Sequence, residues 1–495
     1  MGLEQAHRCG VHEPHLAALG LAVSRGVRGV AMTSDLHRLA RDHLLRPDGQ
    51  EDLCFALWNP SRGRERTTAL VERLILPEGG DRLLHGNVSF TPQYLERSLG
   101  EAAATGCGLA LMHSHPLGFG WQGIGPPDVA AERGNAGAVL GATDLPLVGL
   151  TLAGDEAWSA RFWERTAPRT YLRKWCSAVR VIGDQLTVNY MDELAPRPRV
   201  TNAQMRTVSA WGEAAQANLV RLRVGVIGAG SVGDFIAESL ARTGFEDVTA
   251  IDYDFVEERN LDRLLYATYR DVGASKVHLL GDHLGLRATA DPFRFDPVAA
   301  AVYEELGFRA ALDCDVLFCC VDRPWGRHVL NFIANAHLIP VIDAGNYVRR
   351  NRFGQLAAAD WRAHTATFGR ACLQCVGQYD PSLVHAEREG YLDDPTYIER
   401  LPDDHELRAR ENVFAFSMTC AAHQNLQMLA LALAPLDQPN PGTQRYHFVG
   451  NFMAEPTFAQ CAPGCFFRSV VACGDASGVT VTGPRPPQRT RTHSP

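Results

Sequence analysis

The stretch that most constrains the fold of this chain is residues 224–233, VGVIGAGSVG. An apolar run typical of a buried strand leads into Gly228, Gly230 and Gly233, which can turn the chain into a helix without Cβ hindrance. A helix that begins there points its first amides at a phosphate. A second apolar run ends in Asp252, about twenty residues beyond the last glycine, where a carboxylate can bind a ribose hydroxyl. The pattern predicts a Rossmann-like α/β unit that binds a nucleotide.

The polar residues after this stretch indicate which nucleotide is bound. They are Asn260, Arg263, Lys276 and, after a third apolar run, Asp322. Hydride transfer needs no such cations, whereas the triphosphate of ATP must be neutralised while a carboxylate attacks its α-phosphorus. Asp322 would lie at the end of a neighbouring strand and face the same crevice, where it could hold Mg²⁺. We therefore expect ATP and Mg²⁺, with a dinucleotide-binding dehydrogenase as the alternative.

Together these residues resemble the adenylation domain of the ubiquitin-activating-enzyme superfamily, which includes the ThiF-type adenylyltransferases for sulfur-carrier proteins. The resemblance covers residues 200–482 and implies a Rossmann-like domain with a mainly parallel sheet. The implied ligands are Asp252 for ribose, Gly228, Gly230, Gly233, Asn260, Arg263 and Lys276 for phosphates, and Asp322 for Mg²⁺, with Arg263 and Asp322 also catalytic. The implied activity is ATP-dependent adenylation of the C-terminal glycine of a ubiquitin-like protein.

Two further positions bear on this resemblance. Arg323 stands where the family often has asparagine, which leaves one adenine or phosphate contact open. Upstream, Arg206 and the pair Trp211-Gly212 match a family pattern whose arginine reaches the ATP site of a partner subunit, although Thr207 replaces its glutamine. The resemblance thus implies a catalytic Arg206 and a homodimer, and the alternative is a solvated surface arginine.

The N-terminal half carries a second constellation, HSHP at residues 113–116, after an apolar run. Two imidazoles one residue apart leave a strand on the same side, so His113 and His115 suit two ligands of one zinc ion. Asp128 could supply an oxygen ligand and leave one position for water. Glu51, at the head of a predicted strand, is the candidate general base. The alternative is that both histidines are ordinary polar residues at a strand end.

This constellation resembles the JAB/MPN metalloisopeptidase family over residues 32–195, which implies a smaller α/β domain of the cytidine-deaminase-like type. The resemblance assigns zinc to His113, His115 and Asp128 and the proton-accepting role to Glu51. Gly125 stands where the family has a serine that stabilises the oxyanion, and losing one such donor costs about 10²–10³ in rate. The departure favours metal binding over efficient hydrolysis, and a non-catalytic docking module is the alternative.

Cysteines form a third group of candidate ligands. The chain has 13 cysteines and no recognisable secretory signal, which indicates reduced thiols and metal ligands rather than disulfides. Cys372 and Cys375 form a CxxC in the segment expected to cross over after the apolar run IPVIDAG at residues 339–345. Cys461 and Cys465 form a CxxxC farther along the chain. Two such pairs suit a structural Cys₄ zinc site. The alternative is that one cysteine, Cys372 or Cys375, is a nucleophile that takes the carrier from the adenylate into a thioester.

Bulk properties complete the expectations. A chain of 495 residues predicts two or three domains, and the formal charge of −8 disfavours nucleic-acid binding. The apolar patch at residues 16–23 is too short to span a bilayer, so we expect no membrane contact and a cytoplasmic protein. Residues 1–31 and 483–495 are expected to be disordered. Residues 155–190 are typical of a helix or loop followed by a terminal hairpin.

The two resemblances together imply a bifunctional enzyme of a bacterial ubiquitin-like pathway. The zinc domain would hydrolyse the bond after the carrier's terminal glycine, and the freed carboxylate would then attack ATP. Proximity of the two sites would help to supply substrate. The expected partners are a ubiquitin-like or sulfur-carrier protein and, for conjugation, a conjugating enzyme. The alternative is activation of a sulfur carrier for cysteine, thiamine or cofactor biosynthesis.

Overall fold

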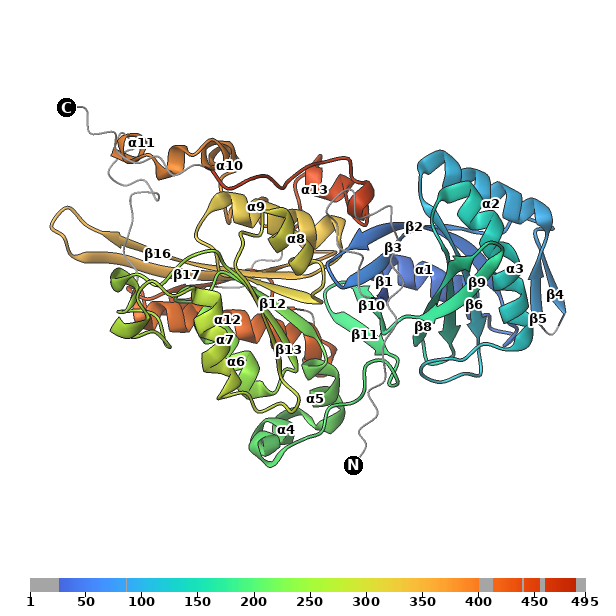
Figure 1. Cartoon of the computed structure of the whole chain (residues 1–495), viewed down its shortest axis with the longest axis horizontal. Helices are drawn as coiled ribbons and strands as arrows, with labels where there is room; N and C mark the ends of the chain where they lie inside the picture. Colours follow the sequence, from blue (N-terminus) through green and yellow to red (C-terminus); the bar gives the residue numbers. More distant parts are fainter. Residues whose placement is uncertain (1–25, 86, 400–412, 439, 455–458, 487–495) are drawn as a thin grey trace, which may run out of the picture.

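The structure is a computed structural model, and it describes residues 26–85, 87–399, 413–438, 440–454 and 459–486. These residues form two α/β units joined by the irregular segment 191–201 (Figure 1). The apolar patch at residues 16–23 and most of both predicted disordered ends lie outside the described residues. Within the described residues, no helix combines the length and the apolar character needed to cross a bilayer.

The N-terminal unit is built on a nine-stranded mixed sheet in the order β11-β10-β1-β3-β2-β6-β7-β8-β9. Its strands are β1 (Val27–Thr33), β2 (Leu53–Arg62), β3 (Arg66–Ile75), β6 (Gly108–His115), β7 (Leu147–Ala153), β8 (Trp158–Ala167), β9 (Thr170–Trp175), β10 (Ala178–Ile182) and β11 (Leu186–Tyr190). Helix α1 (Ser34–Leu44) packs on one face, and α2 (Pro92–Thr105) and α3 (Pro126–Thr143) pack on the other. A separate hairpin is formed by β4 (Arg82–His85) and β5 (Asn87–Phe90). Helices therefore cover both faces of the nine-stranded sheet.

Two expectations for this unit are wrong. Residues 27–31 belong to β1, which lies inside the sheet between β10 and β3, and are not part of a disordered extension. The first part of residues 155–190 forms the strands β8 and β9 rather than a helix or loop. Six consecutive residues from Trp158 are buried because β8 lies between β7 and β9 and is covered on both faces, and such a run has no alternating pattern to reveal a strand.

The C-terminal unit contains an eight-stranded sheet in the order β14-β13-β12-β15-β16-β17-β18-β19. Its strands are β12 (Arg223–Ile227), β13 (Asp247–Ile251), β14 (Arg294–Val298), β15 (Val316–Cys319), β16 (Val341–Arg350), β17 (Leu356–Ala366), β18 (Gln444–His447) and β19 (Phe452–Met453). The five strands from β14 to β16 pair in parallel, and the last three add antiparallel partners. This mainly parallel sheet is the Rossmann-like arrangement expected from the glycine motif.

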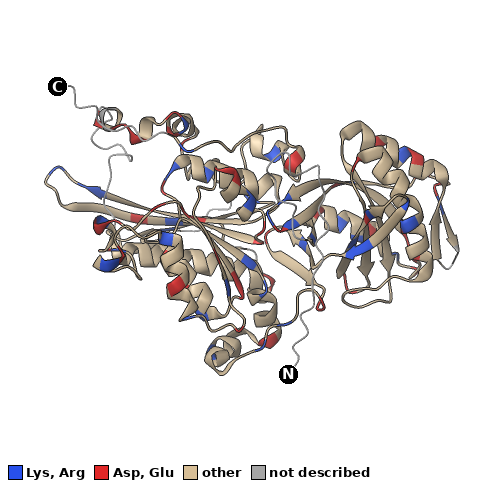
Figure 2. Ribbon diagram, viewed as in Figure 1, with Lys and Arg blue, Asp and Glu red and all other residues tan. Residues whose placement is uncertain are grey.

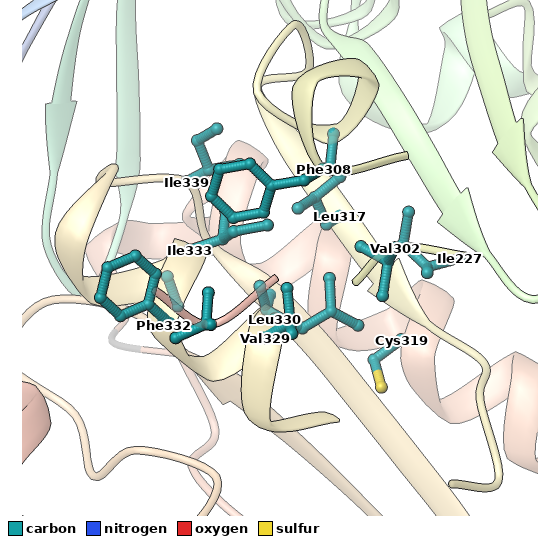
Figure 3. Close-up of a cluster of buried hydrophobic side chains, with 14 of the residues drawn as sticks. Ile227, Val302, Phe308, Leu317, Cys319, Val329, Leu330, Phe332, Ile333 and Ile339 are labelled. Atoms are coloured by element: carbon teal, nitrogen blue, oxygen red, sulfur yellow. The ribbon is translucent and has the colours of Figure 1, made fainter. Parts of the chain in front are cut away.

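Helices cover both faces of this second sheet (Figure 1). One face carries α8 (Glu305–Ala311) and α9 (Pro324–Ala336), and the other carries α6 (Gly233–Thr243), α7 (Lys276–Gly285) and α12 (Phe414–Leu433). The remaining helices are α4 (Met205–Trp211), α5 (Glu213–Val220), α10 (Pro381–Arg388), α11 (Pro395–Glu399) and α13 (Phe466–Ser469). Figure 3 shows the core under α8 and α9, where Phe308, Leu330 and Ile333 gather with Leu317 and Cys319 of β15. The apolar strands are buried on both faces, as parallel sheets require.

The hairpin of β2 and β3 joins the two units. Its tip meets the first residues of the parallel strands, and Asp313 accepts hydrogen bonds from the backbone amides of Arg64, Glu65 and Arg66. Arg66 also donates to Asp315, which directly precedes β15. The contacts of Arg66 are buried and those of Arg64 and Glu65 are partly buried, so the N-terminal unit is fixed to the edge of the sheet at which the parallel strands begin.

The end of the described chain packs against the C-terminal unit. The amide of Gly483 donates to the carbonyl of Tyr303 at 2.8 Å, and the guanidinium of Arg485 lies 3.0 Å from Glu304 and 4.0 Å from the ring centre of Tyr253. The prediction of disorder from residue 483 is therefore wrong for residues 483–486. Residues 487–495 lie outside the described residues.

Candidate nucleotide and metal sites

The glycine loop connects β12 to α6, and its three glycines are required for different reasons. Gly228 has φ +100°, and a Cβ there would lie 2.7 Å from the carbonyl oxygen of Cys320. A Cβ at Gly233 would lie 1.9 Å from the carbonyl oxygen of Gly228, so helix and loop pack too closely for any side chain. A Cβ at Gly230 would meet no heavy atom of the described residues within 4 Å. Gly230 thus faces open space, where a phosphate can approach the backbone.

Two carboxylates extend this loop at the end of β13. Asp252 accepts hydrogen bonds from the amides of Ala229 at 2.7 Å and Asp254 at 2.8 Å, which fixes its carboxylate against the glycine loop. Burial raises the pKa of Asp252, the charge of Lys276 opposes that rise, and Asp254 adds to it. The ammonium of Lys276 lies 2.8 Å from Asp254, with its side chain only 10% exposed. The residues expected to bind ribose and phosphate, Asp252 and Lys276, are therefore joined through Asp254 beside the glycine loop.

Asn260 and Arg263 lie on the segment between β13 and α7. The side-chain oxygen of Asn260 accepts from the amide of Glu257 at 3.0 Å, and Arg263 donates to the carbonyl of Arg259 at 2.8 Å. Both side chains thus bind groups of their own segment. Their positions relative to the glycine loop depend on a residue that the sequence did not single out, Asp234 of α6.

Asp234 directly follows Gly233 and is completely buried. Its Oδ2 accepts from the amide of Leu265 at 2.6 Å, whereas its Oδ1 has no hydrogen-bond partner among the described residues. Burial, partly offset by backbone hydrogen bonds, raises the pKa of Asp234 to about 7. This carboxyl ties the segment that carries Arg263 to α6, the helix that follows the glycine loop. An aspartate in the first turn of a helix is common in sequences, so no local signal distinguishes it.

Asp322 is exposed between the end of β15 and the start of α9, at the same edge of the sheet as Gly228 and Asp252. Its neighbour Arg323 pairs with Asp393 at 2.6 Å, and the amide of Trp325 donates to Glu387 at 2.7 Å. These contacts anchor the segment after the crossover, including α10, on the N-terminus of α9. Arg323 therefore has a structural partner in this chain that an asparagine would reach less readily.

Arg206 is exposed on α4, away from the glycine loop. The turn before α4 packs through Gln204, whose side-chain amide donates to the carbonyl of Thr289, a residue that precedes β14. Helix α4 thus lies near the beginnings of the parallel strands, whereas the nucleotide residues follow their ends. Within one chain Arg206 is not part of the nucleotide site, so any role there requires a second copy.

The candidate metal ligands of the N-terminal unit come together at the end of β6. Ligand atoms of His113, His115 and Asp128 all lie within 4.8 Å of one another, and the two Nε2 atoms are 3.3 Å apart. Burial, followed by the charge of Arg161 and then that of His115, holds the pKa of His113 well below its usual value. A neutral imidazole is the form that binds metal, so two nitrogens and one carboxylate fit a zinc ion with an open position.

Residues around this cluster fix its geometry. Burial has the largest effect on the pKa of Glu51 and raises it. The nearby charge of His115 lowers this pKa, and that of Asp128 raises it. The hydroxyl of Ser114 donates to the carbonyl of Leu44 and accepts from the amide of Asp52, so it holds the chain beside Glu51. The side-chain oxygen of Gln122, in the loop GWQGIG at residues 120–125, lies 3.4 Å from Nδ1 of His115. Sequence reasoning did not assign Gln122 to this role, because only the folded loop brings it to the ring.

The amide of Gly125 donates to Asp128 at 3.0 Å, so this position orients the carboxylate ligand through its backbone. Its φ of −75° is open to any residue, and a Cβ would meet Pro127 and Asp128 only at 3.5 and 3.7 Å. A serine would therefore fit where the resembling family has one. Its absence here is a chemical difference rather than a steric requirement.

Four cysteines form the other candidate metal site. The Sγ atoms of Cys372, Cys375, Cys461 and Cys465 lie within 4.8 Å of one another. The amide of Cys372 donates to Sγ of Cys461, and the next amide, that of Leu373, donates to Asn331 of α9. Burial raises the pKa of Cys375 to about 11, the opposite of what an activated nucleophile needs. Four cysteine thiolates suit a tetrahedral zinc ion, which would join α13 to the segment that carries Cys372 and Cys375.

The nucleotide and His-His-Asp sites lie at opposite ends of the molecule. His113 pairs with Leu53 at the start of β2, whereas Arg64, in the turn after β2, contacts Asp313 just before β15. Nine residue steps of about 3.3 Å separate Leu53 from Arg62, about 30 Å of strand. The glycine loop lies at the far edge of the second sheet. The expectation that the two sites are close together is therefore wrong.

Several known proteins are similar in sequence to part of this chain. The tRNA threonylcarbamoyladenosine dehydratase of Escherichia coli (strain K12) is 30% identical over 144 residues, 28% of this chain and 52% of that protein. The SAMP-activating enzyme E1 of Haloferax volcanii is 28% identical over 136 residues, 28% of this chain and 50% of that protein. The chain thus spans about half the length of these curated relatives.

A crystal structure of E. coli MccB with ATP is similar over 54% of this chain and 74% of that chain, with 16% identity and a TM-score of 0.42. Residues 201–448, which are half of the chain, match the ThiF family. This range begins just after the linker and contains the glycine loop, the carboxylates after β13, Lys276 and Asp322. The chain is a member of the ThiF family of adenylating enzymes.

Proposed function

We propose that this protein uses ATP and Mg²⁺ to adenylate the C-terminal carboxylate of a small ubiquitin-like or sulfur-carrier protein. A carboxylate oxygen attacks the α-phosphorus, a new phosphorus–oxygen bond forms, and pyrophosphate leaves with the electrons of the broken bond. The observation that carries this proposal is the chain of contacts from the amide of Ala229 through Asp252 and Asp254 to Lys276. These contacts support a role for Lys276 as a cation beside the glycine loop.

The other residues would take distinct parts in this reaction. Asp252 binds ribose, Arg263 and Asn260 turn toward the phosphates when ATP draws them from their own segment, and Asp322 holds Mg²⁺. One relative is named an activating enzyme, the SAMP-activating enzyme E1, which supports an activation reaction here. The exposed Arg206 would complete the ATP site of a second copy, so the active form is a homodimer.

ATP–pyrophosphate exchange tests this proposal. The purified chain is incubated with each small protein that ends in glycine and is encoded beside its gene. Exchange that requires one of these proteins and is lost when its terminal glycine is removed supports the proposal. Exchange that none of them stimulates contradicts it. The fate of the adenylate then separates the pathways: a thiocarboxylate formed with sulfide indicates sulfur transfer, and a reductant-sensitive adduct on Cys375 indicates conjugation.

We further propose that the N-terminal unit is a zinc-dependent isopeptidase that cleaves the bond after the carrier's terminal glycine. His113, His115 and Asp128 would hold the ion, which supplies Lewis-acid chemistry when bound. Glu51 would accept a proton, and its raised pKa would make it a better base than an ordinary carboxylate. A carrier fused to a C-terminal reporter tests this role. Cleavage after glycine that is lost in Glu51→Gln supports it, equal cleavage by wild type and variant contradicts the role of Glu51, and no cleavage by zinc-loaded wild type leaves only a docking module.

The Cys₄ cluster is proposed as a structural zinc site. Metal analysis of the purified chain should give zinc that is lost on Cys461→Ser, together with a lower melting temperature. Zinc content that is unchanged by this substitution would contradict the assignment. A covalent carrier adduct lost only on Cys375→Ser would instead favour the thioester role.

A second candidate function is adenylation of a carboxylate carried by RNA. The E. coli relative is named as a tRNA-modifying dehydratase, and arginines cluster at the tip of the β16–β17 hairpin (Figure 2). Arg349 and Arg352 are exposed there, although the whole chain is acidic. ATP consumption stimulated by tRNA, and lost on Arg352→Ala, would favour this candidate over a protein carrier and would overturn the expectation of no nucleic-acid partner.

A further inference from the structure

A charged pair without contact to solvent lies behind the His-His-Asp cluster. Arg161 of β8 is 0% exposed and Glu132 of α3 is 1% exposed. The guanidinium donates to both carboxylate oxygens, one of them at 2.9 Å, and the indole of Trp163 donates to the same carboxylate at 2.6 Å. Every oxygen of Glu132 is therefore engaged, and the pair forms a rigid bidentate unit.

This unit reaches the metal cluster through one hydroxyl. The remaining terminal nitrogen of Arg161 donates to Oγ1 of Thr151 at 2.7 Å, and that oxygen lies 3.4 Å from Nε2 of His113. Thr151 and His113 are register partners on the parallel strands β7 and β6, so their side chains leave the sheet on the same face. Because one lone pair of the threonine oxygen is taken by Arg161, the hydroxyl is fixed beside the coordinating atom of the histidine.

Stability does not explain why the pair is buried. Removing two charges from water costs several kcal/mol per ion, and well-packed apolar residues in their place are often as stable or more so. The local backbone is also shaped to admit the pair: a Cβ at Gly149 of β7 would lie 2.5 Å from both oxygens of Glu132 and 2.7 Å from Nε of Arg161. A strand interior that lacks a side chain and surrounds a charged pair indicates a function for that pair.

We propose that Thr151 is a positioning residue of the metal centre, held by the buried pair Arg161–Glu132. Its hydroxyl places a fourth polar group, besides His113, His115 and Asp128, at the wall that the ion would face. It thereby adds a hydroxyl that can hydrogen-bond to solvent bound to the ion. Because Arg161 and Glu132 neutralise each other, they hold the hydroxyl of Thr151 without adding net charge next to a divalent cation.

This inference rests on the proposed zinc site, and its test reads metal binding rather than catalysis. Cobalt(II), titrated into the full-length protein after metal removal, stands in for zinc. Thiolate ligands give intense charge-transfer bands, whereas a nitrogen and oxygen site gives only weak visible bands, so the Cys₄ site and the histidine site are read separately. His113→Ala identifies the bands of the histidine site.

The informative variants are Thr151→Val, which keeps the shape of the side chain and removes the hydroxyl, and Thr151→Ser, which keeps the hydroxyl. We expect valine to weaken binding at the histidine site by about 10–100-fold, the usual effect of losing a partner of a metal ligand, and serine to restore affinity. Ser98→Ala, which removes another buried hydroxyl of the same unit, is the matched control and should leave affinity unchanged.

The outcomes separate this inference from the proposed function. If wild type binds cobalt at the histidine site and the valine variant binds equally well, Thr151 has no positioning role although the metal site stands. If wild type and His113→Ala give the same spectrum, both the zinc site and this inference are overturned. Melting temperatures of the metal-free proteins show whether the valine variant is folded, and the serine variant tests the hydroxyl even if valine is not tolerated.

Discussion

Nη1 of Arg66 lies 2.5 Å from Oδ1 of Asp315, and this buried ion pair joins the N-terminal unit to the start of β15. Arg180 of β10 lies 3.4 Å from the same carboxylate oxygen. Burial and the neighbouring charge of Arg66 lower the pKa of Arg180 to about 9. Two guanidiniums thus share one carboxylate, and Asp315 provides the central charge of the interface.

We expect Asp315→Asn to destabilise the protein by about 3–5 kcal/mol, because it leaves two buried guanidiniums without their counter-charge. Urea unfolding followed by tryptophan fluorescence measures the change. Asp192→Asn, at a half-exposed carboxylate paired with Arg197 and Arg221, is the control and should cost under about 1 kcal/mol. Equal effects of the two substitutions would show that the interface does not depend on Asp315.

The same carboxylate predicts a dependence on acid. Burial alone would raise the pKa of Asp315, but Arg66 and then Arg180 hold it below its usual value. A lowered pKa adds stability at pH values above the unfolded pKa of about 3.9, and this stability is lost as pH falls through the folded value. Wild type should therefore lose more stability than Asp315→Asn between pH 5 and pH 3, on the order of 1 kcal/mol or more.

Lys276 should be essential for adenylation. Lys276→Ala removes the cation beside Asp254, and we expect carrier-dependent ATP–pyrophosphate exchange to fall by about 10²–10³-fold. The chain has one other lysine, Lys174, which is exposed on β9, and Lys174→Ala is the matched control. An exchange rate that stays within about threefold of wild type in Lys276→Ala would remove this residue from the phosphate site.

Arg206 gives a test of the homodimer. Arg206→Ala and Lys276→Ala should each abolish exchange when pure. After the two variants are unfolded and refolded together, about a quarter of the wild-type activity should return, because half of the random dimers contain one complete site of two. No recovery in mixtures that form dimers would show that Arg206 does not act across subunits.

Gly125→Ser restores the hydroxyl that the resembling family has, at a position where its Cβ fits. We expect cleavage of a carrier–reporter fusion to increase by about 10²-fold, since one oxyanion donor is worth that much. Gly123→Ser is the control. Gly123 lies in the same loop, and a Cβ there would meet no described atom within 4 Å. If both variants match wild type, the missing serine is not what limits hydrolysis.

Asp234 predicts that stability falls as pH rises, the opposite of the acid dependence expected from Asp315. Its folded pKa of about 7 is raised by burial, so the folded state holds a proton that the unfolded state has lost. This contribution to stability is complete below about pH 4 and disappears as pH rises through 7. Asp234→Asn keeps an oxygen for the amide of Leu265 and cannot ionise. Its melting temperature relative to wild type should therefore increase between pH 5 and pH 8, and a constant difference would contradict the raised pKa.

Much of the C-terminal unit could be predicted from local sequence. The spacing of Gly228, Gly230 and Gly233 allows few backbone paths, and apolar runs before Asp252 and Asp322 place both carboxylates at one edge of a parallel sheet. The ligand types at residues 113–116 and at the four cysteines also predicted clusters that the structure does bring together. Local geometry and periodicity were sufficient in these places because they act within a few residues.

Other features depend on contacts between distant parts of the chain. The strand β8 is buried on both faces, so its pattern is not periodic, and Asp234, Gln122 and Thr151 acquire their partners only when separate loops and strands meet. The placement of the two candidate sites at opposite ends follows from the buried charges of one hairpin. The sequence by itself determined which chemical groups are available and which nucleotide-binding unit they belong to. Tertiary structure alone decided which other residues contact these chemical groups, because hydrogen-bond partners and charge states depend on burial and not on sequence spacing.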